Sequence, residues 1–587
     1  MMIELFQDSR FINQKTKGTA DTYDVVICGG GLAGMALARQ LKLKIKNISI
    51  LVLDRFSKPL PTATFKVGES TIESGSYYLA NTLALAEYLK EYHIPKLGLR
   101  FFLGDTKGLF KDRPEIGLSK FYSPSSYQID RGLLENNLRE LNSAAGIVLS
   151  ENCFVQDIVL SSNEQYHEIT YKQGNTKETQ IVKARWVIDA MGRRRFLQKK
   201  LGLAQPNDKT NSAVWFRIDD LIDVSNFVPR TEKHWHERVP NNIRYYSTNH
   251  LVGEGYWVWI IPLSSGFTSI GIVAHEQIHP FKKYNTYEKA YRWLEKHEPA
   301  LALYLQDRQP KDFNKMPYYS YSSTQTFSLT RWACVGEAGI FADPLYSVGL
   351  DLIAISNSLV TEMIRLDFDG KLSKGMLDYA NVFLLKYNDH LNAAIQLSYQ
   401  LLGKNPLVFS LKFLWDVLAG WGFLMPLTFN SIFVELERMA KLQHFFNDFY
   451  ALETRIHKLL IDWLNKSSHK ASFEFMDYLT MLPFVEELRS RNLQDNKTDS
   501  ELNNDYAANL EILEELAQAI FLLALEDTMP EQLSRFTSPV WLNAWAISLD
   551  VNQWENDGLF NPRSKPRDWS RVMDPLRKHI RFSSLVQ

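Results

Sequence analysis

The sequence of 587 residues has few cysteines and no excess of charge of either sign. The three cysteines, Cys28, Cys153 and Cys334, are far apart and odd in number, which argues against a disulfide framework or a zinc site and fits a reducing compartment. There are 66 Lys and Arg against 67 Asp and Glu, so the formal net charge is −1. This balance argues against a nucleic-acid partner bound through a global positive field, and against an acidic disordered protein.

Long hydrophobic runs are scarce as well. The first segment, Met1–Thr22, is mixed and polar and does not resemble a signal peptide. One uncharged run, Val417–Val434, reaches about the lower length limit of a membrane span, but it contains glycines, Pro426 and Asn430. We interpret it as a buried helical hairpin or the wall of an apolar tunnel, with contact to a bilayer as the less favoured alternative. The expectation is a cytoplasmic protein without a membrane span.

What is present is the composition of an ordinary globular protein, with 45% hydrophobic and 23% charged residues. Up to about residue 375, short β-branched runs alternate with helical patterns and glycine turns, whereas from about Met376 onward the periodicity is helical. This predicts an α/β part, 1–375, and a helical C-terminal part, 376–587. A polar stretch, Arg489–Asp505, is expected to be a solvent loop between helices. The clearest helical patterns are Leu391–Leu402, Phe433–Phe446, Thr454–Leu464 and Leu510–Leu525.

The strongest local motif is a glycine turn between a strand and a helix. A buried-strand pattern at Tyr23–Cys28 leads into GGGLAG, and a second strand pattern at Ile48–Leu53 ends at an acidic residue. In a dinucleotide-binding unit the glycines permit the tight turn, the approach of the pyrophosphate and the packing of helix on strand, while the acid accepts the ribose hydroxyls. The cofactor-binding residues expected here are Gly29, Gly31, Leu32, Ala33, Gly34, Asp54 and Arg55.

Two later segments resemble the FAD-dependent monooxygenase superfamily with the hydroxybenzoate-hydroxylase-like fold. VIDAMG at Val187–Gly192 resembles its mid-chain Asp-Ala-x-Gly strand, and GEAG at Gly336–Gly339 resembles its late Gly-Asp segment, with a glutamate where aspartate is usual. The resemblance implies a Rossmann-like FAD domain with an interleaved antiparallel-sheet substrate domain, at about 95–130 and 205–325, and a helical C-terminal region. It adds as cofactor-binding residues Arg131, Asp189, Gly192, Gly336 and Glu337.

The segment WVWIIP at Trp257–Pro262 narrows the resemblance, because it matches the WxWxIP signature of flavin-dependent halogenases. On a strand, Trp257, Trp259 and Ile261 would share one face, while Val258 and Ile260 would point the other way. In that family the two indoles form a wall between flavin and substrate, which gives Trp257 and Trp259 a catalytic role. The alternative is that this aromatic strand is simply part of a sheet core.

Other segments resemble the same family. FKVGES at Phe65–Ser70 resembles its Gly-Glu-Ser turn near the flavin ring, which adds Glu69 and Ser70 to the cofactor site, and Ile94–Gly104 resembles the region whose essential lysine maps onto Lys96. As an ammonium, this lysine could hydrogen-bond hypohalous acid; as an amine, favoured by burial, it could form a haloamine.

The segment DPLYSVG at Asp343–Gly349 resembles the place where halide and flavin edge meet. Consecutive N–H groups entering a helix would form a small anion site. The resemblance assigns Ser347 a catalytic role, Pro344 and Gly349 to the cofactor, and Ser347, Val348 and Gly349 to the halide.

Family members that act on free tryptophan carry a glutamate just before this serine, where this chain has Tyr346. The resemblance therefore implies a halogenase of phenols or pyrroles, free or bound to an acyl or peptidyl carrier protein, in secondary metabolism. It would use FAD, O2 and chloride or bromide. Because a second glycine-rich turn for a nicotinamide cofactor is not found in the sequence, a separate flavin reductase is expected.

Two alternatives stay open. An FAD-dependent hydroxylase or a flavin reductase of unsaturated lipids would use the apolar Val417–Val434 run as a lipid channel. A flavin-binding or carrier-docking protein without activity is kept open by Glu337 and Tyr346, the two departures from the family pattern.

A metal site is not expected, since His234, His236 and Glu237 could ligate a metal from a strand but have no further ligand cluster beside them.

Overall fold

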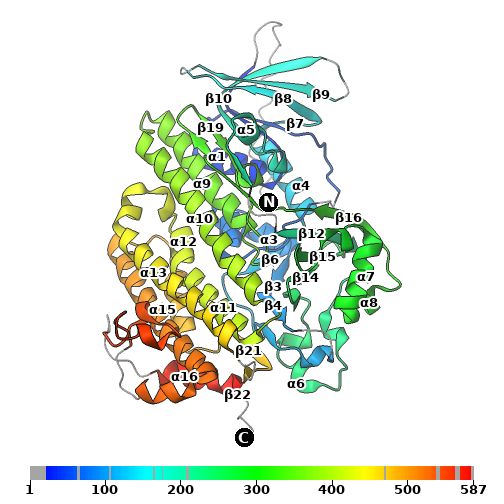
Figure 1. Cartoon of the computed structure of the whole chain (residues 1–587). Coiled ribbons are helices and arrows are strands. Elements are labelled where there is room, and N and C mark those ends of the chain that lie inside the picture. Colours follow the sequence, from blue (N-terminus) through cyan, green and yellow to red (C-terminus); the bar gives the residue numbers. More distant parts are fainter. Residues whose placement is uncertain are drawn as a thin grey trace.

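The computed structural model of the chain describes residues 21–61, 66–104, 108–162, 165–174, 176, 178–206, 210–467, 471–536, 542–561 and 569–582. The interpretation of Met1–Thr22 falls almost entirely outside the described residues, and so does Phe65 of the FKVGES segment. Figure 1 shows two sheets beside a layer of long helices, with the helices on the left of the view and the second sheet on the right.

The glycine turn belongs to a largely parallel sheet. Its strand order is β18-β19-β10-β1-β2-β7, and a hairpin of β8 and β9 continues antiparallel from β10. The apolar end of β1 is fully buried, as expected for a strand covered on both faces. The strands of this sheet are β1 (Thr22–Cys28), β2 (Ile50–Leu53), β7 (Val148–Ser150), β8 (Cys153–Val159), β9 (His167–Gln173), β10 (Thr179–Asp189), β18 (Phe327–Ser328) and β19 (Trp332–Cys334).

Three helices pack next to this sheet: α1 (Leu32–Lys44), α4 (Arg131–Ala144) and α9 (Gly349–Phe368). The carboxyl ends of β1, β10 and β19 lie in register, so the loops that follow them meet at one edge. This edge is where a doubly wound sheet binds its ligands. Short elements nearby are α2 (Glu73–Tyr77), η1 (Tyr78–Thr82), α3 (Ala86–Tyr92), β3 (Ile94–Lys96), β6 (Ser126–Gln128), α5 (Phe196–Lys200), β11 (Ala204–Pro206) and β17 (Tyr321–Ser323).

The second sheet has the order β16-β12-β15-β14-β13-β4-β5-β21. It was expected to be antiparallel, but β13 pairs with β4 in parallel and so does β5 with β21. These pairs differ because the chain reaches each partner by a long connection rather than a hairpin. Its strands are β4 (Leu99–Phe102), β5 (Glu115–Gly117), β12 (Asn211–Ile218), β13 (Thr248–Gly253), β14 (Tyr256–Pro262), β15 (Thr268–His275), β16 (Pro310–Met316) and β21 (Phe475–Asp477).

Strand β14 alternates as predicted. Trp257, Trp259 and Ile261 join the core that includes the C-terminal helices, whereas Val258 and Ile260 join the core beneath α7 (Tyr287–His297) and α8 (Pro299–Leu305). His234 and His236 lie in the short helix α6 (Lys233–His236) and not on a strand. Among the described residues, no group of three or more His, Cys, Asp or Glu side chains is placed to hold a metal.

The C-terminal part is helical, as predicted. Its helices are α10 (Lys374–Leu401), α11 (Pro406–Ala419), η8 (Gly420–Leu424), α12 (Met425–Phe429), α13 (Leu436–Lys466), α14 (Val485–Asn492), α15 (Asp499–Thr528) and α16 (Ser570–His579), and a small β20–β22 pair joins Ala471–Ser472 to Arg581–Phe582. The predicted loop Arg489–Asp505 is too long. Helix α14 continues to Asn492 and α15 begins at Asp499, where Thr498 and Glu501 form a capping box.

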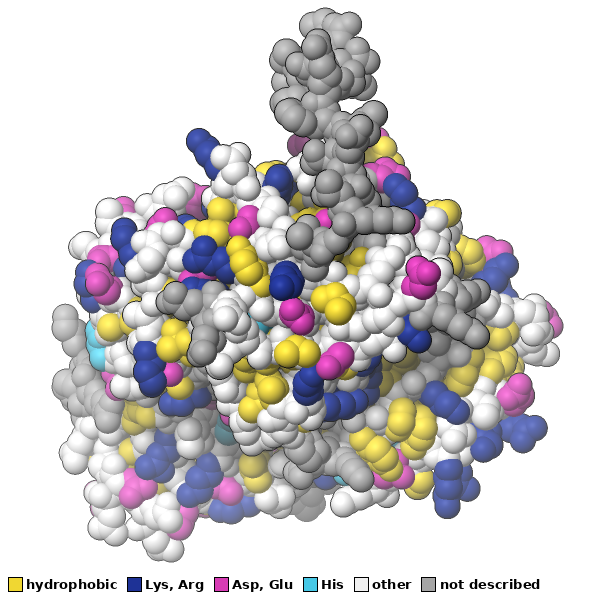
Figure 2. Space-filling model, turned by 90° about the horizontal axis from the view of Figure 1, so that it is seen from above, with side chains coloured by type: hydrophobic (Ala, Val, Ile, Leu, Met, Phe, Trp, Pro, Cys, Tyr) yellow, Lys and Arg dark blue, Asp and Glu magenta, His cyan; other side chains and the backbone are white. Residues whose placement is uncertain are grey.

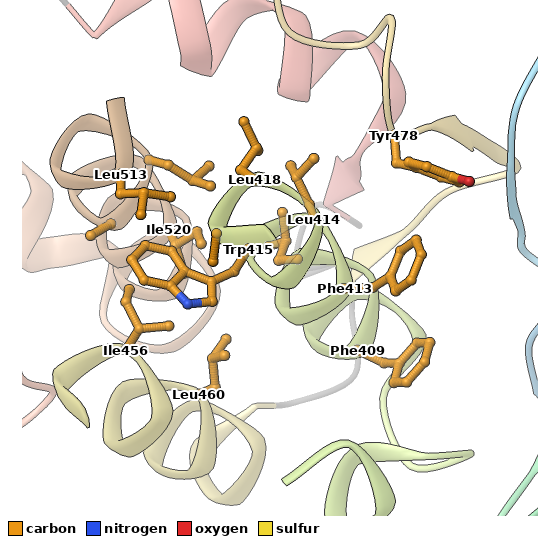
Figure 3. Packing of buried hydrophobic residues seen from close by; sticks show 14 of the residues in the cluster. Phe409, Phe413, Leu414, Trp415, Leu418, Ile456, Leu460, Tyr478, Leu513 and Ile520 are labelled. Carbon is orange, nitrogen blue, oxygen red and sulfur yellow. The ribbon is translucent and has the colours of Figure 1, made fainter. Parts of the chain in front are cut away.

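The uncharged run does not form a hairpin. The helical run continues from Pro406 to Phe429 through the π-turn η8, and the side chain of Asn405 caps its start. Pro426 does not break it, because hydrogen bonding is already shifted at the π-turn that precedes it. By length and composition this helix could cross a membrane, but 78% of its most apolar window is buried inside the protein. Figure 3 shows Trp415 pointing toward Ile456 and Ile520 of the neighbouring helices.

The face of the protein shown in Figure 2 has no large patch of described side chains with charge of one sign. Lys and Arg alternate there with Asp and Glu, and hydrophobic side chains are scattered between them. This pattern agrees with the net charge of −1.

Candidate active site

In the turn between β1 and α1, two glycines are needed for packing and a third leaves space for a ligand. A Cβ at Gly34 would collide with the carbonyl oxygen of Gly29, and one at Gly29, where φ is +115°, would collide with the backbone of Ala190. A Cβ at Gly31 would meet no atom within 4 Å. Gly29 and Gly34 are therefore required by the fold, while Gly31 keeps the space in front of the N-terminus of α1 open, as a bound pyrophosphate requires.

We call the cavity at this turn the cofactor cleft. It has a volume of about 700 Å³ and is lined by most of the residues expected to bind the cofactor: Gly29, Gly31, Leu32, Ala33, Asp54, Arg55, Arg131, Gly192 and Glu337. Asp54, 6% exposed, is held by an ion pair with Arg139. The Arg139 side chain also donates to the carbonyl oxygen of Gly30, at 3.1 Å, and pairs with Glu151, at 2.8 Å. Sequence reasoning missed Arg139, which lies within a helix and carries no local signal.

Asp189 does not line the cleft. Its Oδ1 accepts a hydrogen bond from the backbone N–H of Met191, at 3.0 Å, and its Oδ2 accepts one from Leu197, at 2.8 Å. The side chain is fully buried, and burial raises the pKa of Asp189 to about 6. Asp189 thus holds the loop that brings Gly192 to the cofactor cleft, rather than facing the cofactor as expected.

A smaller cavity of about 130 Å³, which we call the tryptophan pocket, continues from the cofactor cleft. The two share Leu32, Val67, Arg131, Trp215, Met316, Glu337 and Ile353. The predicted residues that the tryptophan pocket adds are Glu69, Ser70, Trp257, Trp259, Gly336, Pro344, Ser347 and Gly349. Segments far apart in the sequence therefore meet as the resemblance implied.

The cofactor-facing side chains of this pocket are held by an ionic network. Glu69 Oε1 accepts hydrogen bonds from Arg217 Nε, at 3.0 Å, and Nη2, at 2.7 Å, and Arg217 also pairs with Asp312, at 2.6 Å. Arg131 donates to the carbonyl oxygen of Val67, at 2.7 Å, and pairs with Glu135, at 2.8 Å. Sequence reasoning missed Arg217, although a single arginine inside the buried strand β12 was a signal that could have found it.

The tryptophans form a fixed wall. Trp257 Nε1 donates to the hydroxyl of Tyr399, at 2.7 Å, Trp259 Nε1 donates to Ser269 Oγ, at 3.1 Å, and the two ring centroids are 5.8 Å apart. His250, which sequence reasoning also missed, lines the same pocket and stacks on Phe101 at 4.6 Å. Burial lowers the pKa of His250 to about 3, so its imidazole is neutral at pH 7.

Lys96 lies at the end of β3 with 5% of its surface exposed. Its Nζ donates to Ser70 Oγ, at 2.9 Å, and to the carbonyl oxygen of Thr71, at 2.6 Å, and Ser70 Oγ also accepts from Ser347 Oγ, at 3.1 Å. Burial lowers the pKa of Lys96 to about 8, against the opposing charges of Glu73 and Asp351. The ammonium and amine forms are therefore both accessible near neutral pH.

Ser347 has a φ of +63°, which is uncommon for a residue other than glycine, and it precedes Val348, the N-cap residue of α9. The residues expected to bind the halide divide between two cavities. Ser347 and Gly349 line the tryptophan pocket, whereas Val348 lines a third cavity.

We call this third space the helix cavity. It has a volume of about 570 Å³, and Lys96 and Tyr346 line it together with side chains from α10, α11, η8, α12 and α13. The expectation that the Val417–Val434 run lines an apolar tunnel is met by Val417, Trp421, Phe423 and Leu424. Lys96 thus faces the helix cavity, while its hydrogen-bond partner Ser70, and Ser347 that donates to Ser70, line the tryptophan pocket.

Known proteins share both the sequence and the architecture. The family model described as tryptophan halogenase matches residues 109–375. The flavin-dependent halogenase chlA of Dictyostelium discoideum is 28% identical, over 61% of this chain and 62% of its own length. A 1H-pyrrole-2-carbonyl-[peptidyl-carrier protein] chlorinase of Pseudomonas fluorescens is 23% identical, over 62% of this chain and 83% of its own length. The chain is therefore similar in sequence to flavin-dependent halogenases.

Solved structures extend the likeness in fold to the C-terminal helices. A mutant of halogenase PltM in complex with FAD superposes with a TM-score of 0.60 at 18% identity, covering 86% of this chain and 97% of that one. Within the flavin-dependent halogenase fold, the described residues fit FAD: the cofactor cleft and the tryptophan pocket are continuous, and Gly31 leaves open space before a helix N-terminus.

Proposed function

We propose that this protein is a halogenase that uses reduced FAD, O2 and chloride or bromide to halogenate an electron-rich aromatic ring. The observation that carries the proposal is the position of Lys96. It is buried where the helix cavity approaches the tryptophan pocket, and hydrogen bonds tie it to Ser70 on the cofactor side. A lysine in this place can receive an oxidised halogen from one cavity and present it to a ring in the other.

Bound reduced FAD would supply the chemistry that converts halide and O2 into hypohalous acid. The chain's own residues would do the rest. Trp257 and Trp259 form an aromatic wall of the tryptophan pocket, Ser347 and the N–H groups at the start of α9 favour an anion, and Lys96 hydrogen-bonds the hypohalous acid as an ammonium or forms a haloamine as an amine.

We propose a phenol or a pyrrole as the substrate, free or bound to a carrier protein. Tyr346 supports this choice, because it lines the helix cavity where family members acting on free tryptophan carry a glutamate. The similar protein of Pseudomonas fluorescens is a 1H-pyrrole-2-carbonyl-[peptidyl-carrier protein] chlorinase, which supports a pyrrole on a carrier protein as one of the two substrate classes. A separate flavin reductase is proposed because the sequence contains one dinucleotide fingerprint, and a cytoplasmic location is supported by the three free, buried cysteines.

The test is mass spectrometry of a panel of phenols and pyrroles, each free and carrier-bound, incubated with the protein, a flavin reductase, FAD, O2 and bromide. We expect a product with the isotope pattern of bromine that disappears when bromide is omitted. A hydroxylated product that forms without halide, or direct and rapid oxidation of NAD(P)H by the protein alone, would instead support the hydroxylase or reductase alternatives.

A further inference from the structure

A polar cluster lies in the wall of the helix cavity, on elements that the roles proposed above leave unused. Asp416 of α11 and Glu453 of α13 both line this cavity. Asp416 forms an ion pair with Lys412, whose fully buried Nζ also donates to the carbonyl oxygen of Ala394, at 2.7 Å. Glu453, 6% exposed, lies with Oε2 3.1 Å from Nδ1 of His390. Buried charged side chains in a largely apolar wall are costly to the fold and point to a ligand.

Tyr346 lies beside the cluster and lines the same cavity as Lys96. This tyrosine directly precedes Ser347, its hydroxyl hydrogen-bonds with Ser398 Oγ at 2.7 Å, and its ring centroid is 5.4 Å from Lys412 Nζ. The pKa of Tyr346 is raised well above its usual range by burial and then by the charge of Asp416. Asp416, Tyr346 and Lys96 therefore line the same cavity.

Burial makes both carboxylates stronger bases in their ionised forms, and for Glu453 the ionised form is the minor one at pH 7 and the major one above about pH 8. Burial, and then the charge of Asp416, raises the pKa of Glu453 to about 8, while Lys412 opposes the rise; burial also raises the pKa of Asp416. Burial lowers the pKa of His390 to about 4, so this imidazole is neutral at pH 7. The titratable and charged groups that face Glu453 are Lys412 and Asp416 on α11, His390 on α10, and Tyr450 and His457 on α13.

We propose that Asp416 and Glu453 bind the hydroxyl group of a phenolic substrate and accept its proton while the halogen is transferred. This role rests on the proposed halogenase function. It names a phenol rather than a pyrrole, because the acid–base pair is placed to receive an O–H proton in a cavity whose apolar wall holds the ring.

The step balances in atoms and electrons. The π electrons of the ring form the carbon–halogen bond, and the halogen–oxygen bond of hypohalous acid breaks with its electron pair on oxygen. The phenolic O–H bond gives its proton to the carboxylate, which passes it to the leaving hydroxide to make water. The resulting dienone loses its ring proton and regains one on oxygen, which restores the aromatic phenol. The hypohalous acid is the oxidant, and the proposed function supplies it.

A phenol and its methyl ether distinguish this role from a structural one. A methyl ether presents a similar ring but has no O–H proton to give. Since a positioned base contributes about 10²- to 10⁴-fold, we expect Glu453→Gln and Asp416→Asn to slow bromination of the phenol by about 100-fold and that of the ether very little. Asp416→Glu should recover much of the phenol rate. The matched control is Glu437→Gln, on the exposed surface of α13, which should leave both rates unchanged.

Asp416→Asn leaves the buried Lys412 without its partner, and such a change often destabilises a protein severely. The double variant Lys412→Met/Asp416→Leu removes both charges together and should fold, as judged by FAD retention and urea unfolding, while still losing the preference for phenol over ether. A folded double variant that keeps the wild-type preference would overturn the role of Asp416, and an unchanged preference in Glu453→Gln would overturn that of Glu453.

Binding of 4-nitrophenol gives a readout that does not depend on turnover, because its phenol and phenolate forms absorb differently. Removing the negative charge in Asp416→Asn while Lys412 stays positive should lower the pKa of bound 4-nitrophenol; Lys412→Met should raise it. Equal values in the wild type and both variants would contradict contact with the hydroxyl. If the wild type brominates neither the phenol nor the ether, the proposed halogenase function is wrong, and so is this role. If bromination is normal and every variant keeps the wild-type preference for phenol over ether, only this role is wrong.

Discussion

The cofactor cleft continues into the tryptophan pocket, which approaches the helix cavity at Lys96, but the cleft and the helix cavity are built from different kinds of structure. The cleft is made by loops at the carboxyl ends of parallel strands, and its key feature is backbone: an open helix N-terminus and a glycine that leaves space. The helix cavity is made by side chains on the faces of α10, α11 and α13. Recognition through backbone depends on one local motif, whereas recognition through helix faces depends on how distant segments pack.

Because of this difference, we expect substitutions in the two regions to abolish activity in different ways. Damage to the cleft should remove the cofactor, and damage to the helix cavity should leave the cofactor bound and remove substrate chemistry. Lys96 lies at the boundary, with hydrogen bonds to the cofactor side and its ammonium in the helix cavity wall. The variants below test this separation, beginning with the largest expected effect.

Lys96→Ala should abolish halogenation, by at least about 1000-fold, because no other group would hold the oxidised halogen beside the ring. FAD binding should be unaffected, since Lys96 does not line the cofactor cleft. Product formation is measured by mass spectrometry and FAD occupancy by absorbance. Lys90→Ala, on the exposed surface of α3, is the matched control. A normal product yield from Lys96→Ala would refute the role assigned to this lysine.

Gly31→Val should prevent retention of FAD while leaving the fold intact. At Gly31 the backbone φ is −78°, which any residue adopts, and an added side chain meets no protein atom within 4 Å, so what it would displace is the pyrophosphate. The measurement is FAD absorbance after gel filtration, alongside the circular dichroism of the purified variant. Gly375→Val, at an exposed glycine with similar space, is the control. A Gly31→Val protein that stays yellow at full occupancy would contradict the placement.

The same difference between backbone motifs and packed helix faces explains which site residues could be predicted from the sequence. Gly31 and the Trp257–Trp259 pair were predictable because each motif is contiguous and its spacing alone fixes its geometry. Asp416 and Glu453 were not predictable, because they come from separate helices and become neighbours only when those helices pack. The orientation of Asp189 was not predictable for a related reason: the motif places the residue at the end of a strand, but tertiary contacts turn its carboxylate to the N–H groups of Met191 and Leu197.

Lys96→Met should change how stability depends on pH. The pKa of Lys96 is about 8 in the folded state and 10.5 when unperturbed, so between these pH values the unfolded chain holds more protons than the folded one. Wild-type stability should therefore rise with pH across this window, by about 1–3 kcal/mol relative to Lys96→Met, and the difference should be constant below pH 8. Urea unfolding at pH 7 and pH 10 measures it, with Lys90→Met as control. Parallel pH profiles for wild type and Lys96→Met would show that the lysine is not desolvated.

Tyr399→Phe tests whether the two regions are mechanically joined. The hydroxyl of Tyr399, on α10, accepts a hydrogen bond from Trp257 and donates to Asp343 at 3.1 Å, so it links the helix layer to the tryptophan wall. Its removal leaves the buried indole N–H of Trp257 without this partner, which should cost about 1–2 kcal/mol of unfolding free energy. Tyr166→Phe, at a half-exposed tyrosine, should cost almost nothing. If Tyr399→Phe unfolds at the same urea concentration as the wild type, the wall is held by packing of the indoles alone, and the helix cavity and the tryptophan pocket can move independently.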